Sequence, residues 1–359
     1  MAQLGAQPGA ETRLSIVRSR AIFKSPFIAL PGLFKASADL IMPFRFKLHE
    51  PIDEGLRRIV SEQIARACQE LDCAGQVVPS AIHNTRKAIK RLRALLRLAR
   101  PALGEKAFSA HNASLQSIAA SLSSTRDDDI VSETIDKLET QFGEDGIKIL
   151  APLRHSLAEK SGVKPRIGGE QAHEVAQRLT IENEDFAALN VRADLSTLKQ
   201  GLQKSYAKAV KAYAAAYENP SDESFHDLRK TVQWHWRQMA LLSRAWPDYF
   251  KVRVDAAREL SQILGDEHDL SLLRASVAAR DDLTLDQHGP IIRLARARQE
   301  ELRHEALSRA ELLLFEPPKP FAKRMAGLWA AGRDGRATHG RDEQKPGGKT
   351  TVGLTLRTG

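Results

Sequence analysis

Cysteine and aromatic residues are both scarce in this chain. It contains only two cysteines, Cys68 and Cys73, among 359 residues, and aromatic residues make up 6% of it. The two cysteines form neither a CxxC pair nor part of a longer series of metal ligands. The sequence therefore predicts a protein of a reducing compartment, by default the cytoplasm, without structural disulfides.

Long apolar runs are also missing. The N-terminal stretch IFKSPFIALPGLF is apolar, but Lys24, Pro26 and Pro31 interrupt it. A signal peptide or a membrane-spanning helix needs an unbroken apolar core, so we expect neither. Runs of the strand-favouring residues Val, Ile and Thr are scarce as well, whereas Ala, Leu, Arg, Glu and Lys are abundant. This composition predicts an all-α protein.

Acidic residues are fewer than basic ones. The chain has 54 Lys and Arg against 45 Asp and Glu, which gives a formal net charge of +9. A charge of this sign favours a polyanionic partner such as nucleic acid, an anionic membrane surface or polyphosphate.

Amphipathic patterns with the period of a helix fill most of the chain. They predict helices over 52–72, 79–100, 104–122, 126–141, 147–160, 169–181, 195–218, 221–245, 248–264, 267–280, 289–312 and 318–331. Residues 1–43 and 332–359 lack such a pattern. We expect the first to be a partly disordered extension and the second a disordered tail.

An internal repeat organises the helical part. The stretch AIHNTRKAIKRLRALLRLARPALG is echoed by SFHDLRKTVQWHWRQMALLSRAWPDYF, in which His226, Arg229 and Lys230 align with His83, Arg86 and Lys87. Downstream of them, SLSSTRDDDIV and QILGDEHDLSLL each indicate the end of one helix and an Asp-rich start of the next. We therefore expect two copies of a four-helix unit. They would cover residues 50–142 and 191–285, with a helical insert over 143–190 and C-terminal helices over 286–331.

The helix over residues 79–100 carries an unusual charge pattern. Residues 80–101 contain seven Lys and Arg and no acidic residue. On a helical wheel one face is apolar, and the opposite face carries His83, Arg86, Lys90, Arg93 and Arg97, with Lys87 and Arg91 beside them. Cations one turn apart repel each other. A stripe of one sign therefore indicates that a polyanion neutralises it, although a solvated face is the alternative.

The second copy keeps only part of this stripe. Its basic residues are His226, Arg229, Lys230 and Arg237, whereas Gln233, Trp234, Trp236 and Ala240 replace basic residues of the first copy. Weaker candidates for the binding face are Lys204 and Lys208 in the helix over 195–218 and Lys323 near the C-terminus. For these scattered cations a solvated face is at least as good an explanation. His235 falls on the apolar face and is expected to be packed in the core.

The doubled His-x-x-Arg helix resembles the CHAD family, the conserved histidine α-helical domain. The resemblance covers residues 44–331 and includes FRFKLHEPIDEGLRRIV, FHDLRKTV, ELSQILGDEHDLSLL and EPPKPFAKRMAGLW. It implies two pseudo-symmetric four-helix bundles that face each other across a basic groove, and a role in binding inorganic polyphosphate, also at polyphosphate granules. The phosphate-contacting positions that it implies are His83, Arg86, Lys90, Arg91, Arg93, Arg97, His226, Arg229 and Lys230. The turns at 123–124 and at Gly265-Asp266 would be structural.

The leading hypothesis is therefore a binding protein for inorganic polyphosphate, without enzymatic activity and without a cofactor, which could also recruit polyphosphate-metabolising enzymes. Nucleic-acid binding is the main alternative, because Trp234 and Trp236 could stack on bases, although the first basic helix has no aromatic residue. A metal-dependent phosphohydrolase is a third hypothesis. It rests on His226-Asp227 and His268-Asp269, but neighbours on a helix point about 100° apart and form no convincing ligand set.

Overall fold

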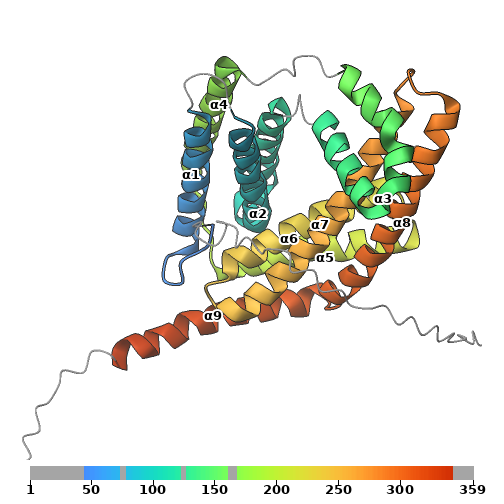
Figure 1. The fold of residues 1–359 in the computed structure, drawn as a ribbon. Coiled ribbons are helices and arrows are strands. Elements are labelled where there is room, and N and C mark those ends of the chain that lie inside the picture. The colour runs from blue at the N-terminus through green and yellow to red at the C-terminus, as the bar shows by residue number, and fades with distance from the viewer. Residues whose placement is uncertain (1–43, 73–77, 123–126, 161–167, 343–359) are drawn as a thin grey trace, which may run out of the picture. The chain divides into compact units, whose positions relative to one another are not determined.

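The computed structural model describes residues 44–72, 78–122, 127–160 and 168–342. Cys73, residues 1–43 and the Ser123-Ser124 turn lie outside these ranges, as do residues 343–359. Within them all regular secondary structure is helical, which confirms the all-α prediction (Figure 1). The helices are α1 (Ile52–Leu71), α2 (Pro79–Ser121), α3 (Asp127–Lys160), α4 (Gly169–Ala187), α5 (Leu195–Glu218), α6 (Asp222–Leu242), α7 (Pro247–Ala278), α8 (Leu285–Leu313) and α9 (Pro318–Asp342).

Two of these helices are bent at a glycine. Gly104 in α2 and Gly143 in α3 have positive φ angles of 72° and 59°, and each interrupts the helical backbone. Glycine adopts this conformation without the steric cost that a Cβ atom would add. The bends lie at or near the two predicted breaks, so four of the predicted helices form two bent ones.

The predicted turn at Gly265-Asp266 is wrong, because α7 continues through both residues. Gly265 has no positive φ angle and adopts the helical conformation at a cost of about 1 kcal/mol relative to alanine. A Cβ atom at this position would lie 4.0 Å from Nη2 of Arg229, an ordinary van der Waals distance, so alanine would also fit here. At the other end of the chain, α9 continues to Asp342, beyond the predicted end at residue 331.

The larger hydrophobic core joins α1, α2, α4, α5, α6 and α9 with the first half of α7 and the C-terminal end of α8. Its largest fully buried side chains include Phe46, Tyr206, Phe225 and Trp329. His235 is 3% exposed, and its ring lies against Tyr206 and Phe321, as expected for a packed histidine.

A smaller core joins α3 to the second half of α7 and to α8. Val131, Ile135 and Leu138 of α3 pack there with residues such as Leu273 of α7 and Ile291 of α8. The division into two pseudo-symmetric bundles stays a prediction.

Close packing fixes α2 against α5 and α6. Gly201 of α5 lies so near α2 that a Cβ atom would sit 1.9 Å from the carbonyl oxygen of Leu98. The amide Nε2 of Gln238, which is buried in α6, donates to the carbonyl oxygen of Ala94 at 3.3 Å. Because α6 also packs along α7, it lies between the basic helix α2 and α7.

Candidate anion-binding site

A cavity of about 420 Å³ lies between α2, α6 and α7. Its lining consists of Arg86, Lys90, Arg93, Ile130, His226, Arg229, Lys230, Gln233, Trp234, Arg237, His268, Asp269 and Leu272. Six of these residues are Lys or Arg, two are His, and Asp269 alone among them is acidic. The cavity therefore concentrates positive charge in a partly enclosed space, where it acts more strongly than in bulk water.

On the α2 side of the cavity, carbonyl and amide oxygens accept hydrogen bonds from two arginines. Nη1 of Arg86 donates to the carbonyl oxygen of Leu122 at 3.0 Å, close to the end of α2. The guanidinium of Arg93 donates to Oδ1 of Asn112 and to Oε1 of Gln116, each at 3.1 Å. These oxygens orient the two guanidiniums and add no negative charge at these hydrogen bonds.

The α6 side contributes cationic and histidine side chains from several turns of the helix. His226, Arg229 and Lys230 come from the first turns, and Arg237 follows two turns later with Nη1 bonded to the carbonyl oxygen of Gln233 at 2.8 Å. Nζ of Lys230 lies 2.5 Å from Oδ1 of Asp227, so this cation is partly compensated. Both residues of that pair are about half exposed, and such surface pairs hold a lysine weakly.

Two histidines from different helices meet in the cavity. The ring centroids of His226 in α6 and His268 in α7 are 4.7 Å apart. Burial, together with Arg229 and His226, lowers the pKa of His268 to about 4. Burial and the charges of Lys230 and Arg229 also lower the pKa of His226. Both rings are therefore neutral at pH 7, and Nδ1 of His226 is buried without a hydrogen-bond partner among the described residues.

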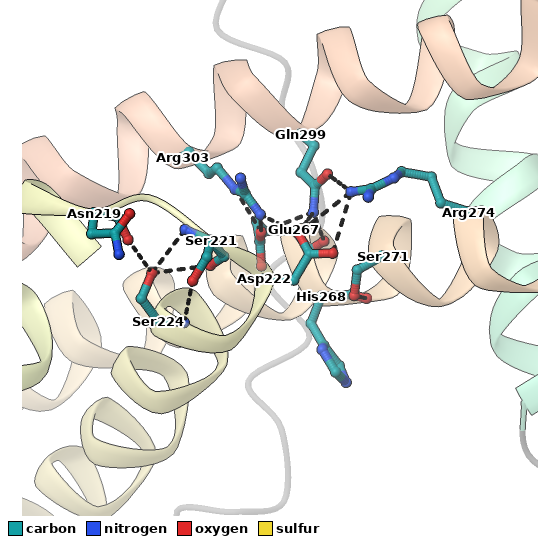
Figure 2. Close-up of polar contacts among 10 residues, drawn as sticks. All are labelled: Asn219, Ser221, Asp222, Ser224, Glu267, His268, Ser271, Arg274, Gln299 and Arg303. Carbon is teal, nitrogen blue, oxygen red and sulfur yellow. Dashed lines mark hydrogen bonds and ion pairs between the residues drawn. The ribbon is translucent and has the colours of Figure 1, made fainter. Parts of the chain in front are cut away.

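A polar network joins α6, α7 and α8 next to His268 (Figure 2). Arg303 of α8 pairs with Asp222, in the first turn of α6, and with Glu267 of α7, where Nε lies 2.8 Å from Oε1. Glu267 is 1% exposed, and burial raises its pKa. Gln299 donates to Asp222 at 3.1 Å and to Oε1 of Glu267 at 3.0 Å.

This network is adjacent in sequence to both histidines. Asp222 lies one helical turn before His226, and Glu267 directly precedes His268. The side chain of His268 points away from the network, as neighbouring residues of a helix do (Figure 2). The contacts of Glu267 with α8 therefore fix how α7 is rotated and which way His268 faces.

The structure brings together seven of the predicted site residues at this cavity. They are Arg86, Lys90, Arg93, His226, Arg229, Lys230 and Arg237. Trp234, which departs from the basic pattern, also lines the cavity, and Arg97 lies over its ring at 3.9 Å. Arg97 itself bonds to the carbonyl oxygen of Arg93 and does not line the cavity.

Arg91 differs from the expectation that it lies beside the basic stripe. It is 6% exposed, and its guanidinium contacts Gln63 of α1 and the ring of Phe44. The remaining candidates also lie outside the cavity lining. His83, Lys204, Lys208 and Lys323 are exposed, and Lys87 is half-buried.

Sequence reasoning missed His268 and Asp269 as members of this cavity. Their signal was the His-Asp dipeptide, which was weighed only as part of a metal site. Among the described residues, no three His, Cys, Asp or Glu side chains are grouped closely enough to hold a metal ion. In the same part of the chain, no helix has the length and apolar sequence required to cross a membrane.

No curated protein matches the chain. Among solved structures, the CHAD domain from the plant Ricinus communis is 17% identical with a TM-score of 0.50, covering 76% of this chain and 94% of its own. PptA from Streptomyces chartreusis is 15% identical with a TM-score of 0.49, covering 73% of this chain and 99% of its own. At these identities the plant structure supports the fold alone.

The family comparison is more direct. The model of the CHAD domain matches residues 58–278, which is more than half of the chain and includes every residue that lines the cavity. The protein therefore belongs to the CHAD domain family.

Proposed function

We propose that this protein binds inorganic polyphosphate in the cavity between α2, α6 and α7. The observation that carries the proposal is the convergence of six Lys and Arg side chains and two histidines on one cavity with a single acidic residue. A phosphate chain carries a negative charge on every unit. Each arginine can hold two phosphate oxygens at once, and each lysine acts as a point charge.

The spacing of the cations suits an extended ligand. Arg86, Lys90 and Arg93 follow one another along α2, so their Cα atoms are about 4.5–6 Å apart along the helix axis. Arg229, Lys230 and Arg237 face them from α6. A linear polyanion between the two helices would contact both rows, and the affinity would be the sum of many modest charge-assisted contacts.

Nucleic acid is the competing ligand, and Trp234 is the observation in its favour. A binder of single strands usually offers exposed aromatic rings for base stacking. Here Arg97 already lies 3.9 Å from the centre of the Trp234 ring, so stacking a base on that face would require Arg97 to leave. This contact favours polyphosphate, which has no bases, over RNA or single-stranded DNA.

We infer binding without catalysis. The residues that line the cavity include no serine, threonine, cysteine or tyrosine that could act as a nucleophile. The rings of its two histidines contact each other, with their centroids 4.7 Å apart. The family's association with polyphosphate supports a place at polyphosphate granules in the cytoplasm and contact with polyphosphate-metabolising enzymes.

The test is a titration of the full chain with long-chain polyphosphate. The triple variant Arg86→Ala/Lys90→Ala/Arg93→Ala should lose at least about tenfold in affinity, since each charge-assisted contact contributes about 1.5–3 kcal/mol. A matched control, Lys148→Ala/Lys251→Ala/Arg309→Ala, removes the same charge from surface ion pairs and should bind nearly as the wild type does. Equal loss in both triple variants would show that net charge, and not the cavity, determines binding.

A further inference from the structure

Three arginines gather beyond the Arg237 end of the cavity. The backbone amide of Phe46 donates to the carbonyl oxygen of Leu241 at 3.0 Å, which places Arg45 beside the last turn of α6. Arg244 follows the end of that helix. Arg258 of α7 lies over the ring of Trp236 in α6 at 4.8 Å. The segment before α1, the end of α6 and α7 thus each supply one guanidinium to the same region.

Among the described residues, no ion pair joins Arg45, Arg244 or Arg258 to a carboxylate, whereas the nearby Arg58 is paired with both Glu50 and Glu62. Burial lowers the pKa of Arg45, and the positive charges of Arg244 and Arg258 lower it further. Like charges held together without acidic partners repel one another, so an anion that joined them would be stabilised.

The cluster is continuous with the cavity through Trp236. The guanidinium of Arg237, which lines the cavity, lies 4.1 Å from the centre of the Trp236 ring, and Arg258 approaches the same side chain. Positive charge therefore continues from the cavity to the end of α6 without an intervening carboxylate in these contacts. With two guanidiniums over it, Trp236 is poorly available for base stacking.

We propose that Arg45, Arg244 and Arg258 form a second phosphate-binding site, which takes the segment of a polyphosphate chain that extends out of the cavity. This inference rests on the proposed function. None of the three residues was singled out by the sequence pattern, because they come from three separate segments. A chain long enough to reach both sites would bind with the advantage of two linked contacts, whereas a short one would occupy one site at a time.

The experiment compares ligands of two lengths on the full chain. Tripolyphosphate and long-chain polyphosphate are titrated into the wild type and into Arg45→Ala/Arg244→Ala/Arg258→Ala. We expect the long chain to lose at least about tenfold in affinity and its salt dependence to fall by about two units, at ~0.7 per lost contact, while tripolyphosphate binding changes little. The control is again Lys148→Ala/Lys251→Ala/Arg309→Ala.

The single variant Arg244→Glu keeps the test valid if the triple variant misfolds. Arg244 is exposed, and among the described residues it makes no contact that holds the fold. It should show the same selective loss for the long chain. If long-chain binding is unchanged in both variants, the second site is refuted while binding in the cavity stands. If the control loses as much as the triple variant, net charge determines binding, and the second site is refuted together with the cavity. If the wild type binds neither ligand, the proposed function and this inference both fail.

Discussion

His226 and His268 are the residues whose charge should change most when a polyanion enters the cavity. Both are neutral at pH 7 in the free protein, because burial and neighbouring cations lower their pKa values, that of His268 to about 4. Bound phosphates would raise both pKa values. The affinity should therefore increase as the pH falls below the pKa values of the complex, and level off once the free protein is also protonated.

Calorimetry in buffers with different ionisation enthalpies measures how many protons the protein takes up when it binds the ligand. At about pH 5.5 the wild type should take up protons when it binds long-chain polyphosphate, and His226→Asn/His268→Asn should take up none. Proton uptake that persists in the double variant would assign it to other groups and contradict this account of the pair.

Single residues also show what a helical wheel can and cannot predict. The wheel correctly placed Arg86, Lys90 and Arg93 on one face, because the face of a residue depends only on the period of the helix. It could not show that α1 packs over Arg91 or that Trp234 of α6 covers Arg97. Those outcomes depend on which helix packs against each flank, and the local sequence does not contain that information.

At the scale of helices, the contacts of Arg303 hold α6, α7 and α8 together behind the cavity. Arg303→Met would leave Glu267 buried without its cation, at a cost of about 3–5 kcal/mol in unfolding free energy. Because α7 would lose the contact that sets its rotation, polyphosphate affinity and the proton uptake of the histidine pair should fall as well.

The matched control is Arg309→Met, which breaks a surface pair between the same helices, α8 and α7. It should cost less than about 1 kcal/mol and leave binding unchanged. Denaturant unfolding and polyphosphate titration distinguish the two variants. A stable Arg303→Met protein with normal binding would show that the network does not position the cavity.

A second helix contact, between α2 and α4, should depend on pH. Nδ1 of His111 lies 2.7 Å from Oε1 of Glu182, and both side chains are buried. The hydrogen bond to Glu182 raises the pKa of His111 in the folded protein. The contribution of this pair to stability is therefore complete below about pH 6.5, the pKa of an unperturbed histidine, and is lost as the pH rises through the raised pKa.

The unfolding free energy of Glu182→Gln at two pH values tests whether the contribution of this pair falls as the pH rises. The variant should be about 1–3 kcal/mol less stable than the wild type near pH 6, and the difference should shrink near pH 9. Glu159→Gln, which alters the exposed pair with His155, should change stability little at either pH. A Glu182→Gln deficit that grows with pH would contradict the assignment.

Helix positions were predictable where the amphipathic pattern was long, as α5 at residues 195–218 shows. The bends at Gly104 and Gly143 were anticipated as breaks. Gly265 was misjudged, because the resemblance implies a Gly-Asp turn there, whereas α7 continues through both residues. One glycine in a long helix costs only about 1 kcal/mol relative to alanine, which the contacts of the rest of the helix can offset.

For the whole molecule, composition indicated a basic all-α protein, and the His-x-x-Arg repeat indicated the family. The convergence of α2, α6 and α7 around one cavity needed the structure, since it joins residues as far apart in sequence as Arg86 and His268. The same holds for α3, which packs on α7 and α8. Long-range packing of this kind cannot be read from one sequence.

The most direct test of the central claim is competition between long-chain polyphosphate and single-stranded RNA at equal phosphate concentration, over a series of salt concentrations. It uses the wild type and Arg86→Ala/Lys90→Ala/Arg93→Ala. We expect polyphosphate to displace RNA from the wild type at every salt concentration, and the variant to lose this preference together with its affinity. If RNA competes equally, or if the variant binds polyphosphate as the wild type does, the cavity is not a polyphosphate site.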